Sequence, residues 1–350
     1  MNMDKINYAG GLYTACIFLG TVIGAGFATG QEAYQFFASF GTAGLFGVVF
    51  CGILFYFICK NTLHLGARVR ASSFLCFLLP GPGPAIAHFF HMITTSFLFV
   101  VFGVMGSALA TLGTELFHSP PYAGFLLYLF IMAFLLSGSE RYLSILSVIL
   151  CPIMIFCILF LCLYVLIGSD LSVFSSLRLN EISSAPFLSA LLYCGYNALS
   201  AIPILSTLHT LVPNKKTARF SALLCAGVFG MCLFLLTLAL SGFYGEIKSL
   251  ELPLLYVATL GGDVVRAVYF IILLCAILTT GAGCGFVLRK SMGERRGATF
   301  IICSSSFVFC LFNFSFLVSK LYAFFGFFGI VLIALIILEN RRQSKLCTGD

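Results

Sequence analysis

The chain has 350 residues, of which 61% are hydrophobic and 9% are charged, and its formal net charge is +7. A soluble globular protein needs many more charged residues on its surface, so the composition excludes this class. It predicts an all-α integral membrane protein. The Lys and Arg residues stand between apolar runs, where membrane topology accounts for them, and we expect no nucleic-acid partner.

Ten apolar runs have lengths suited to crossing about 30 Å of hydrocarbon as helices. The first five predicted spans are 10–40, 41–58, 85–112, 122–136 and 143–167. The second five are 185–208, 222–244, 267–287, 298–317 and 321–338. The outer loop before the eighth span holds a further apolar stretch, 252–258, which is either a lid-like or re-entrant helix or an amphipathic surface helix.

The basic residues test this number of spans, because cytoplasmic loops carry an excess of Lys and Arg. With the N-terminus inside, 15 of the 19 fall on the inner side, and only Arg178, Lys248, Arg266 and Lys320 fall outside. One helix more or fewer in the middle of the chain would destroy this asymmetry. We therefore predict ten transmembrane helices with both termini in the cytoplasm.

The first predicted span is rich in glycine. Gly20, Gly24, Gly26 and Gly30 each weaken a helix by up to ~1 kcal/mol relative to alanine. Glu32 follows before the apolar run ends. The pattern favours a helix broken between Gly24 and Gly26, although the Gly20/Gly24 and Gly26/Gly30 pairs also have the GxxxG spacing of close helix packing.

The sixth predicted span carries a similar interruption, with Gly195, Asn197 and Pro203 in its middle. Interrupted segments at corresponding places in two halves favour a transporter binding site. We therefore predict one transmembrane domain, 1–350, with inverted repeats over 8–167 and 185–338 and with helices 1 and 6 broken. An unwound stretch exposes N–H groups that suit an anionic group and carbonyls that suit a small cation.

The stretch 24–32, with the sequence GAGFATGQE, resembles the YkvI-type uncharacterised bacterial membrane proteins. The helix pattern resembles the LeuT-fold transporters of the amino acid–polyamine–organocation superfamily. The resemblance implies a LeuT-like 5+5 inverted repeat in a bacterial cytoplasmic membrane, with the lipid bilayer and a small-molecule solute as partners. The sequence does not specify an oligomeric state.

The same resemblance implies a sodium site. In sodium-coupled members, carbonyls of the first helix join an Ala carbonyl and two adjacent hydroxyls of the eighth helix around the ion. The matching positions here are Gly20, Ile23, Ala276, Thr279 and Thr280. Neutral oxygens suit a hard cation, although threonine hydroxyls also often bond to the backbone of their own helix.

For the solute, the resemblance implies contacts with both interrupted helices. They would come from Gly24, Ala25 and Gly26 on the first helix and from Tyr193, Gly195, Tyr196 and Asn197 on the sixth. Glu32 is a further candidate, because a membrane carboxylate usually faces a cavity, pairs with a cation or carries protons. The alternative places Glu32 at the hydrated outer end of its half-helix.

These features predict a cation-coupled symporter, with sodium as the coupling ion, that moves a small polar, amino-acid-like solute by alternating access. One alternative is proton coupling through Glu32. Another is a nutrient-sensing membrane subunit of the same fold that binds solute without transporting it. The chain shows no nucleotide-binding, nucleophile or zinc motif, so we expect neither an enzyme nor a cofactor other than a sodium ion.

Overall fold

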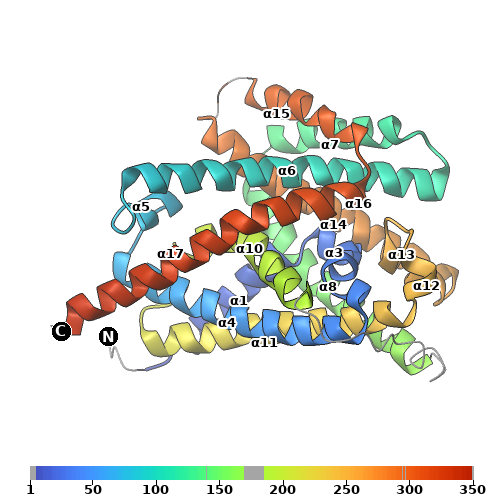
Figure 1. Ribbon diagram of the computed structural model, residues 1–350. Coiled ribbons are helices and arrows are strands. Elements are labelled where there is room, and N and C mark those ends of the chain that lie inside the picture. The colour runs from blue at the N-terminus through green and yellow to red at the C-terminus, as the bar shows by residue number, and fades with distance from the viewer. Residues whose placement is uncertain (1–4, 139, 169–184, 294, 296, 349–350) are drawn as a thin grey trace.

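The computed structural model describes residues 5–138, 140–168, 185–293, 295 and 297–348. Every regular element in this part of the chain is a helix, and most of the long helices run roughly along one direction (Figure 1). The start of α1 and the end of α17 lie at the same end of the bundle, and α12 and α13 lie at the opposite end.

Among the described residues, six helices are long and apolar enough to cross a membrane. Five are single elements: α4 (Thr42–Val69), α6 (Pro84–Phe117), α10 (Ala185–Leu205), α11 (Lys215–Gly242) and α14 (Asp263–Ser291). The sixth is a continuous run that joins α16 (Phe314–Leu317), the π-helical turn η3 (Val318–Tyr322) and α17 (Ala323–Thr348). These six correspond to the second, third, sixth, seventh, eighth and tenth predicted spans.

The other predicted spans coincide with helices that are shorter, that contain a proline or that continue into a 3₁₀ turn. They are α1 (Tyr8–Val22), α7 (Pro121–Ser137), α8 (Glu140–Gly168), which contains Pro152, and α15 (Ala298–Ser306) followed by the 3₁₀ turn η2 (Phe307–Leu311). The total of ten transmembrane helices and the inverted repeat therefore stay predictions.

The first predicted span contains two changes of direction. After α1 the chain leaves the helix at Ile23 and Gly24, and it re-enters α2 (Ala25–Ala28) from an extended Gly24 with φ −105° and ψ −165°. A second turn at Gly30, with φ +78°, leads into α3 (Gln31–Phe36) and the 3₁₀ turn η1 (Ala38–Phe40). Only glycine adopts the left-handed conformation of Gly30 without strain.

The prediction of a break in the sixth span is wrong, because α10 is an uninterrupted helix. A Cβ atom on Gly195 would lie 2.1 Å from the carbonyl oxygen of Gly326 in α17, so this glycine permits close packing of two backbones. The Asn197 side chain donates to the Tyr193 carbonyl of its own helix at 3.0 Å. Pro203 stands in the last turn, where its missing N–H costs one bond.

The predicted boundary between the ninth and tenth spans is also wrong. Phe312 and Asn313 are extended, with ψ of 141° and 146°, so the last long helix begins at Phe314. Hydropathy does not show this corner, because residues on both sides of it are apolar.

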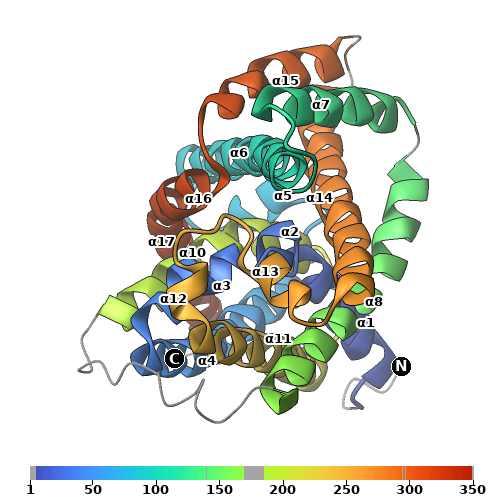
Figure 2. The ribbon, with the colours of Figure 1, turned by 90° about the vertical axis from the view of Figure 1, so that its right-hand side faces the viewer.

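The apolar stretch of the outer loop forms α13 (Pro253–Thr259), which follows the short α12 (Tyr244–Ile247). Leu254, Val257 and Ala258 are fully buried, so α13 packs into the bundle as a lid and not on its surface. Figure 2 shows α13 next to α2 and α3 near the middle of this end of the bundle.

Around the interrupted first span, α1 packs against α11, and α10 packs against α4 and α17. On the other side, α14 packs against α6, and α7 lies with α15 beyond α6 (Figures 1 and 2). The short α5 (Phe74–Leu78) connects α4 with α6. This arrangement surrounds the interruption with long helices, so its free backbone groups face protein and not lipid.

Candidate functional site

A cavity of about 560 Å³ lies at the interruption between α1 and α2. Its wall is formed by α1, α2, α3, α6, α8, α10, α14 and the π-helical turn η3. Of the thirteen candidate site residues predicted from the sequence, eleven line this cavity: Gly20, Ile23, Gly24, Ala25, Gly26, Glu32, Tyr196, Asn197, Ala276, Thr279 and Thr280.

The remaining two candidates lie behind the wall. Tyr193 is fully buried, and its hydroxyl donates to Oε2 of Glu32 at 3.5 Å, so it contacts a lining residue and not the cavity. Gly195 faces α17, as described above. In the structure, Tyr193 therefore supports the lining residue Glu32, and Gly195 packs against α17.

Thr280 connects α14 directly to the interruption. Its hydroxyl oxygen accepts a hydrogen bond from the Ala25 N–H at 3.3 Å. A Cβ atom on Gly24 would lie 3.2 Å from the same oxygen, so a larger residue would push this hydroxyl away. The bond satisfies one of the free N–H groups at the start of α2.

The five predicted sodium ligands all line the cavity, and each carries a neutral oxygen, either a backbone carbonyl or a threonine hydroxyl. Within the part of the chain that the structure describes, no donor bonds to the carbonyls of Gly20 and Ile23, which lie where α1 ends. Thr279 donates to the carbonyls of Cys275 at 2.8 Å and Ala276 at 3.2 Å, as the alternative interpretation expected. Its oxygen keeps the capacity to accept or to ligate, so the donor set fits a hard monovalent cation.

Glu32 stands in the first turn of α3 with only 6% of its surface exposed. A Cβ atom on Gly26 would lie 2.0 Å from Oε1 of Glu32, so the carboxylate rests directly against this glycine. No basic side chain among the described residues forms an ion pair with it. The alternative that placed Glu32 at a hydrated helix end is therefore wrong, because the carboxylate lies in the cavity wall.

Several lining residues were not predicted. Thr94, Phe97 and Met105 come from α6, and Tyr322 comes from η3. The sequence shows only that α6 passes the right depth, not which of its faces points inward. No sequence signal marks the π-helical turn that places Tyr322, although such turns are frequent at functional sites.

The end of the bundle near α13 is closed by hydrogen bonds. The Leu254 N–H of α13 donates to the Thr29 carbonyl at 3.0 Å, and the Tyr269 hydroxyl of α14 donates to the Ala28 carbonyl. The Gln31 side chain donates to the Ser315 hydroxyl of α16 at 2.8 Å. These contacts join the segment after the interruption to three other elements.

The cavity extends the other way, towards the end of the bundle that holds the chain termini. Its wall continues to Pro203 in the last turn of α10 and to Val287 near the end of α14. The chain after α10 leads to Thr217, whose hydroxyl accepts from the Asn7 N–H just before α1. The cavity is thus closed beside α13 and extends towards the N-terminal end of α1.

No family model matches the chain. It is 24% identical to the uncharacterised membrane protein YkvI of Bacillus subtilis (strain 168), over 94% of this chain and 96% of YkvI. It is 25% identical to the uncharacterised protein YyaD of the same strain, again over 94% of this chain and 96% of the relative. The resemblance to YkvI-type membrane proteins is therefore confirmed.

Two solved structures share the arrangement of helices. MhsT, in complex with L-phenylalanine, matches with a TM-score of 0.65 and 15% identity over 94% of this chain and 88% of MhsT. Mhp1, in an inward-facing conformation, matches with a TM-score of 0.58 and 14% identity over 94% of this chain and 76% of Mhp1. Both are LeuT-fold transporters. The chain has the LeuT fold.

Proposed function

We propose that the protein is a secondary transporter of a small polar, amino-acid-like solute and that the cavity at the interruption is its binding site. One observation carries this proposal: the interruption, α10 and α14 meet in a single cavity that is closed at one end of the bundle. Alternating access needs such a site, which opens to one side at a time. The LeuT fold of two transporters supports the same class of function.

The charge distribution and the cavity together suggest the state of the transporter. With both termini in the cytoplasm of a bacterial cell, the end of the bundle that holds them is the inner end. The cavity extends to that end, and α13 covers the other. The structure then corresponds to an inward-facing state, in which solute leaves towards the cytoplasm and α13 must move to admit it from outside.

We assign the coupling ion as sodium, held by Gly20, Ile23, Ala276, Thr279 and Thr280. This assignment rests on the resemblance and on the presence of all five residues in the wall of the same cavity. An ion there would tie the end of α1 to α14. Binding of sodium would therefore favour one arrangement of these two helices over the other.

Uptake in proteoliposomes tests the proposal. We would supply radiolabelled amino acids and the amines obtained by removing their carboxyl groups, each with an inward sodium gradient and with potassium in its place. Accumulation of at least one solute that depends on sodium supports the proposal. Uptake that proceeds equally without sodium overturns the sodium assignment, and binding without any flux favours the sensor.

Proton coupling is a second candidate, because Glu32 is buried without a basic partner among the described residues. A carboxylate in this position is stabilised by a proton or by a cation. Replacing the sodium gradient by an inward proton gradient separates the two mechanisms. Uptake that follows the proton gradient in the absence of sodium would make Glu32 the coupling group.

A further inference from the structure

The cavity contains an acidic group but no basic one. Glu32 is its single Asp or Glu, and no Lys, Arg or His stands among its lining residues, all of which are described. The Tyr193 hydroxyl donates to the carboxylate at 3.5 Å, which is long for a donor to a charged oxygen. An ionised carboxylate buried in this way needs a positive partner, and the cavity is the only direction from which a solute can supply it.

The carboxylate also lies beside the segment to which the sequence analysis assigned the solute's own anionic group. Its Oε1 lies against Gly26, within the interrupted segment, and a methyl group on that glycine would overlap it. A second carboxylate beside it would meet a like charge at close range, which is unfavourable inside a protein. The solute therefore does not need a carboxylate and is better recognised without one.

Aromatic rings border the cavity close to Glu32. The ring centroids of Tyr196 and Tyr322 are 4.8 Å apart, and those of Phe97 and Tyr322 are 5.7 Å apart. All three residues line the cavity, and ring faces attract a cation that is already partly removed from water. This group, Phe97, Tyr196 and Tyr322, suits an ammonium group that approaches Glu32.

The opposite wall is apolar. It is built by Leu150, Ile153 and Met154 of α8 and by Ile271 and Ile272 of α14. A polar body would lose hydrogen bonds to water here without gaining others, whereas an apolar body would not. A volume of about 560 Å³ is within the usual range for small-molecule sites and is sufficient for a single-ring solute.

We propose that the cavity binds an organic monoamine as a cation, with its ammonium group paired to the Glu32 carboxylate beside Tyr196 and its apolar body against α8 and α14. The proposal rests on the proposed function, that of a secondary transporter with its binding site in this cavity, and changes the solute from an amino-acid-like molecule to an amine that lacks a carboxylate. It makes Glu32 the residue that selects for an ammonium group and against a carboxylate.

Four probes with the same phenyl ring test this selection on the purified full-length protein in detergent. 2-Phenylethylamine has only the ammonium group, L-phenylalanine has both charged groups, 3-phenylpropionate has only the carboxylate, and 2-phenylethanol has neither. We expect 2-phenylethylamine to bind most tightly in calorimetry and 3-phenylpropionate to bind most weakly. Equal or tighter binding of 3-phenylpropionate would overturn the proposal.

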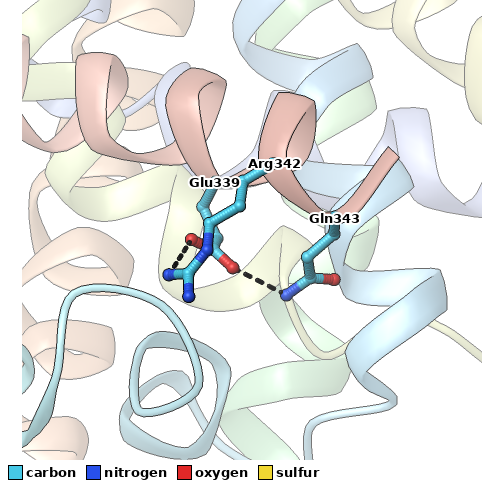
Figure 3. A network of polar contacts seen from close by, with 3 residues as sticks. All are labelled: Glu339, Arg342 and Gln343. Atoms are coloured by element: carbon cyan, nitrogen blue, oxygen red, sulfur yellow. Dashed lines mark hydrogen bonds and ion pairs between the residues drawn. The ribbon is translucent and has the colours of Figure 1, made fainter. Parts of the chain in front are cut away.

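The variant Glu32→Gln removes the charge and keeps the shape. We expect it to weaken 2-phenylethylamine about tenfold or more and to leave 2-phenylethanol unchanged, because only the amine loses an ion pair. Glu339→Gln is the matched control, since this carboxylate lies on α17 outside the cavity and pairs with Arg342 and Gln343 (Figure 3). Unchanged amine affinity in Glu32→Gln would contradict the proposal.

If Glu32→Gln does not fold, Glu32→Asp replaces it in the test, because it keeps the charge on a shorter side chain. We expect this variant still to prefer 2-phenylethylamine over 2-phenylethanol, but by a smaller factor. Loss of that preference in a folded Glu32→Asp protein would also contradict the proposal. Sodium-driven uptake of L-phenylalanine with no binding of the amine would overturn this inference and leave the proposed function intact. Binding of the amine without transport of any solute would support this inference and overturn the proposed function.

Discussion

Gly195 and Gly26 belong to the two predicted helix interruptions but have different neighbours in the structure. A Cβ atom on Gly195 would meet the backbone oxygen of Gly326 at 2.1 Å, whereas one on Gly26 would meet the end of the flexible Glu32 side chain. The backbone of α17 cannot yield without moving the helix, but a carboxylate can rotate away. At Gly195 the missing side chain therefore stabilises a helix pair, and at Gly26 it makes room for a functional group.

We predict that Gly195→Ala destabilises the protein by about 1–3 kcal/mol, the usual cost of an extra methyl group in a packed site. Gly227→Ala on α11 is the control, because a Cβ atom there has open space around it. Thermal unfolding of both variants in detergent measures the difference. A Gly195→Ala variant as stable as the control would show that α10 and α17 are packed more loosely than the structure indicates.

The sequence identifies the candidate residues better than their roles. Glycine spacing indicated Gly24 and Gly26, the resemblance to sodium-coupled LeuT-fold transporters implied Thr280, and all three residues line the cavity. Gly195 and Asn197 gave the same kind of signal, yet they belong to a continuous helix. The difference depends on Gly326, which is more than a hundred residues away, and no local pattern contains it.

Among the elements, α13 has the clearest mechanical role. It contributes no residue to the cavity wall, but its Leu254 N–H and the nearby Tyr269 hydroxyl hold the two carbonyls at the end of α2. The sequence predicted an apolar segment here and left open whether it was a lid or a surface helix. Burial of Leu254 and Val257 decides for the lid.

We predict that Tyr269→Phe loosens this closed end. The variant loses one buried hydrogen bond, worth about 1 kcal/mol, so local opening should become about fivefold more frequent. Hydrogen exchange of peptides that cover α2 and α13 measures this opening. Tyr128→Phe is the control, because its hydroxyl also donates to a backbone carbonyl, that of Phe102, but lies away from α13. Equal exchange in both variants would contradict a closing role for Tyr269.

At the scale of the whole molecule, hydropathy and charge predict more than any motif does. The apolar runs locate every long helix because burial in lipid requires continuous apolar surface, and the start of α1 and the end of α17 lie at one end of the bundle. Hydropathy does not predict corners such as the one at Phe312 and Asn313, because the chain changes direction there within an apolar run. Hydropathy does not predict which residues of two helices distant in the sequence line the same cavity.

The proposed sodium ion would join two such helices, and this can be tested. If the ion joins the end of α1 to α14, it binds the folded state and stabilises it, by about 2.7 kcal/mol when its concentration is about 100 times Kd. We predict that replacing potassium by sodium raises the unfolding temperature of the wild type, and that Thr279→Ala combined with Thr280→Ala abolishes the difference between the two ions.

Thr237→Ala on α11 controls for the loss of a buried hydroxyl, since Thr237 lies outside the cavity wall and its hydroxyl has no partner among the described residues. It should change stability in both salts equally and keep the sodium effect. The contrast isolates ion binding from packing, because packing does not distinguish sodium from potassium. A sodium effect that survives the double variant would move the ion away from α14. No sodium effect in the wild type would mean that no ion joins α1 to α14, and the interrupted span would then be held to α14 by the bonds of Ala25 with Thr280 and of Ala28 with Tyr269.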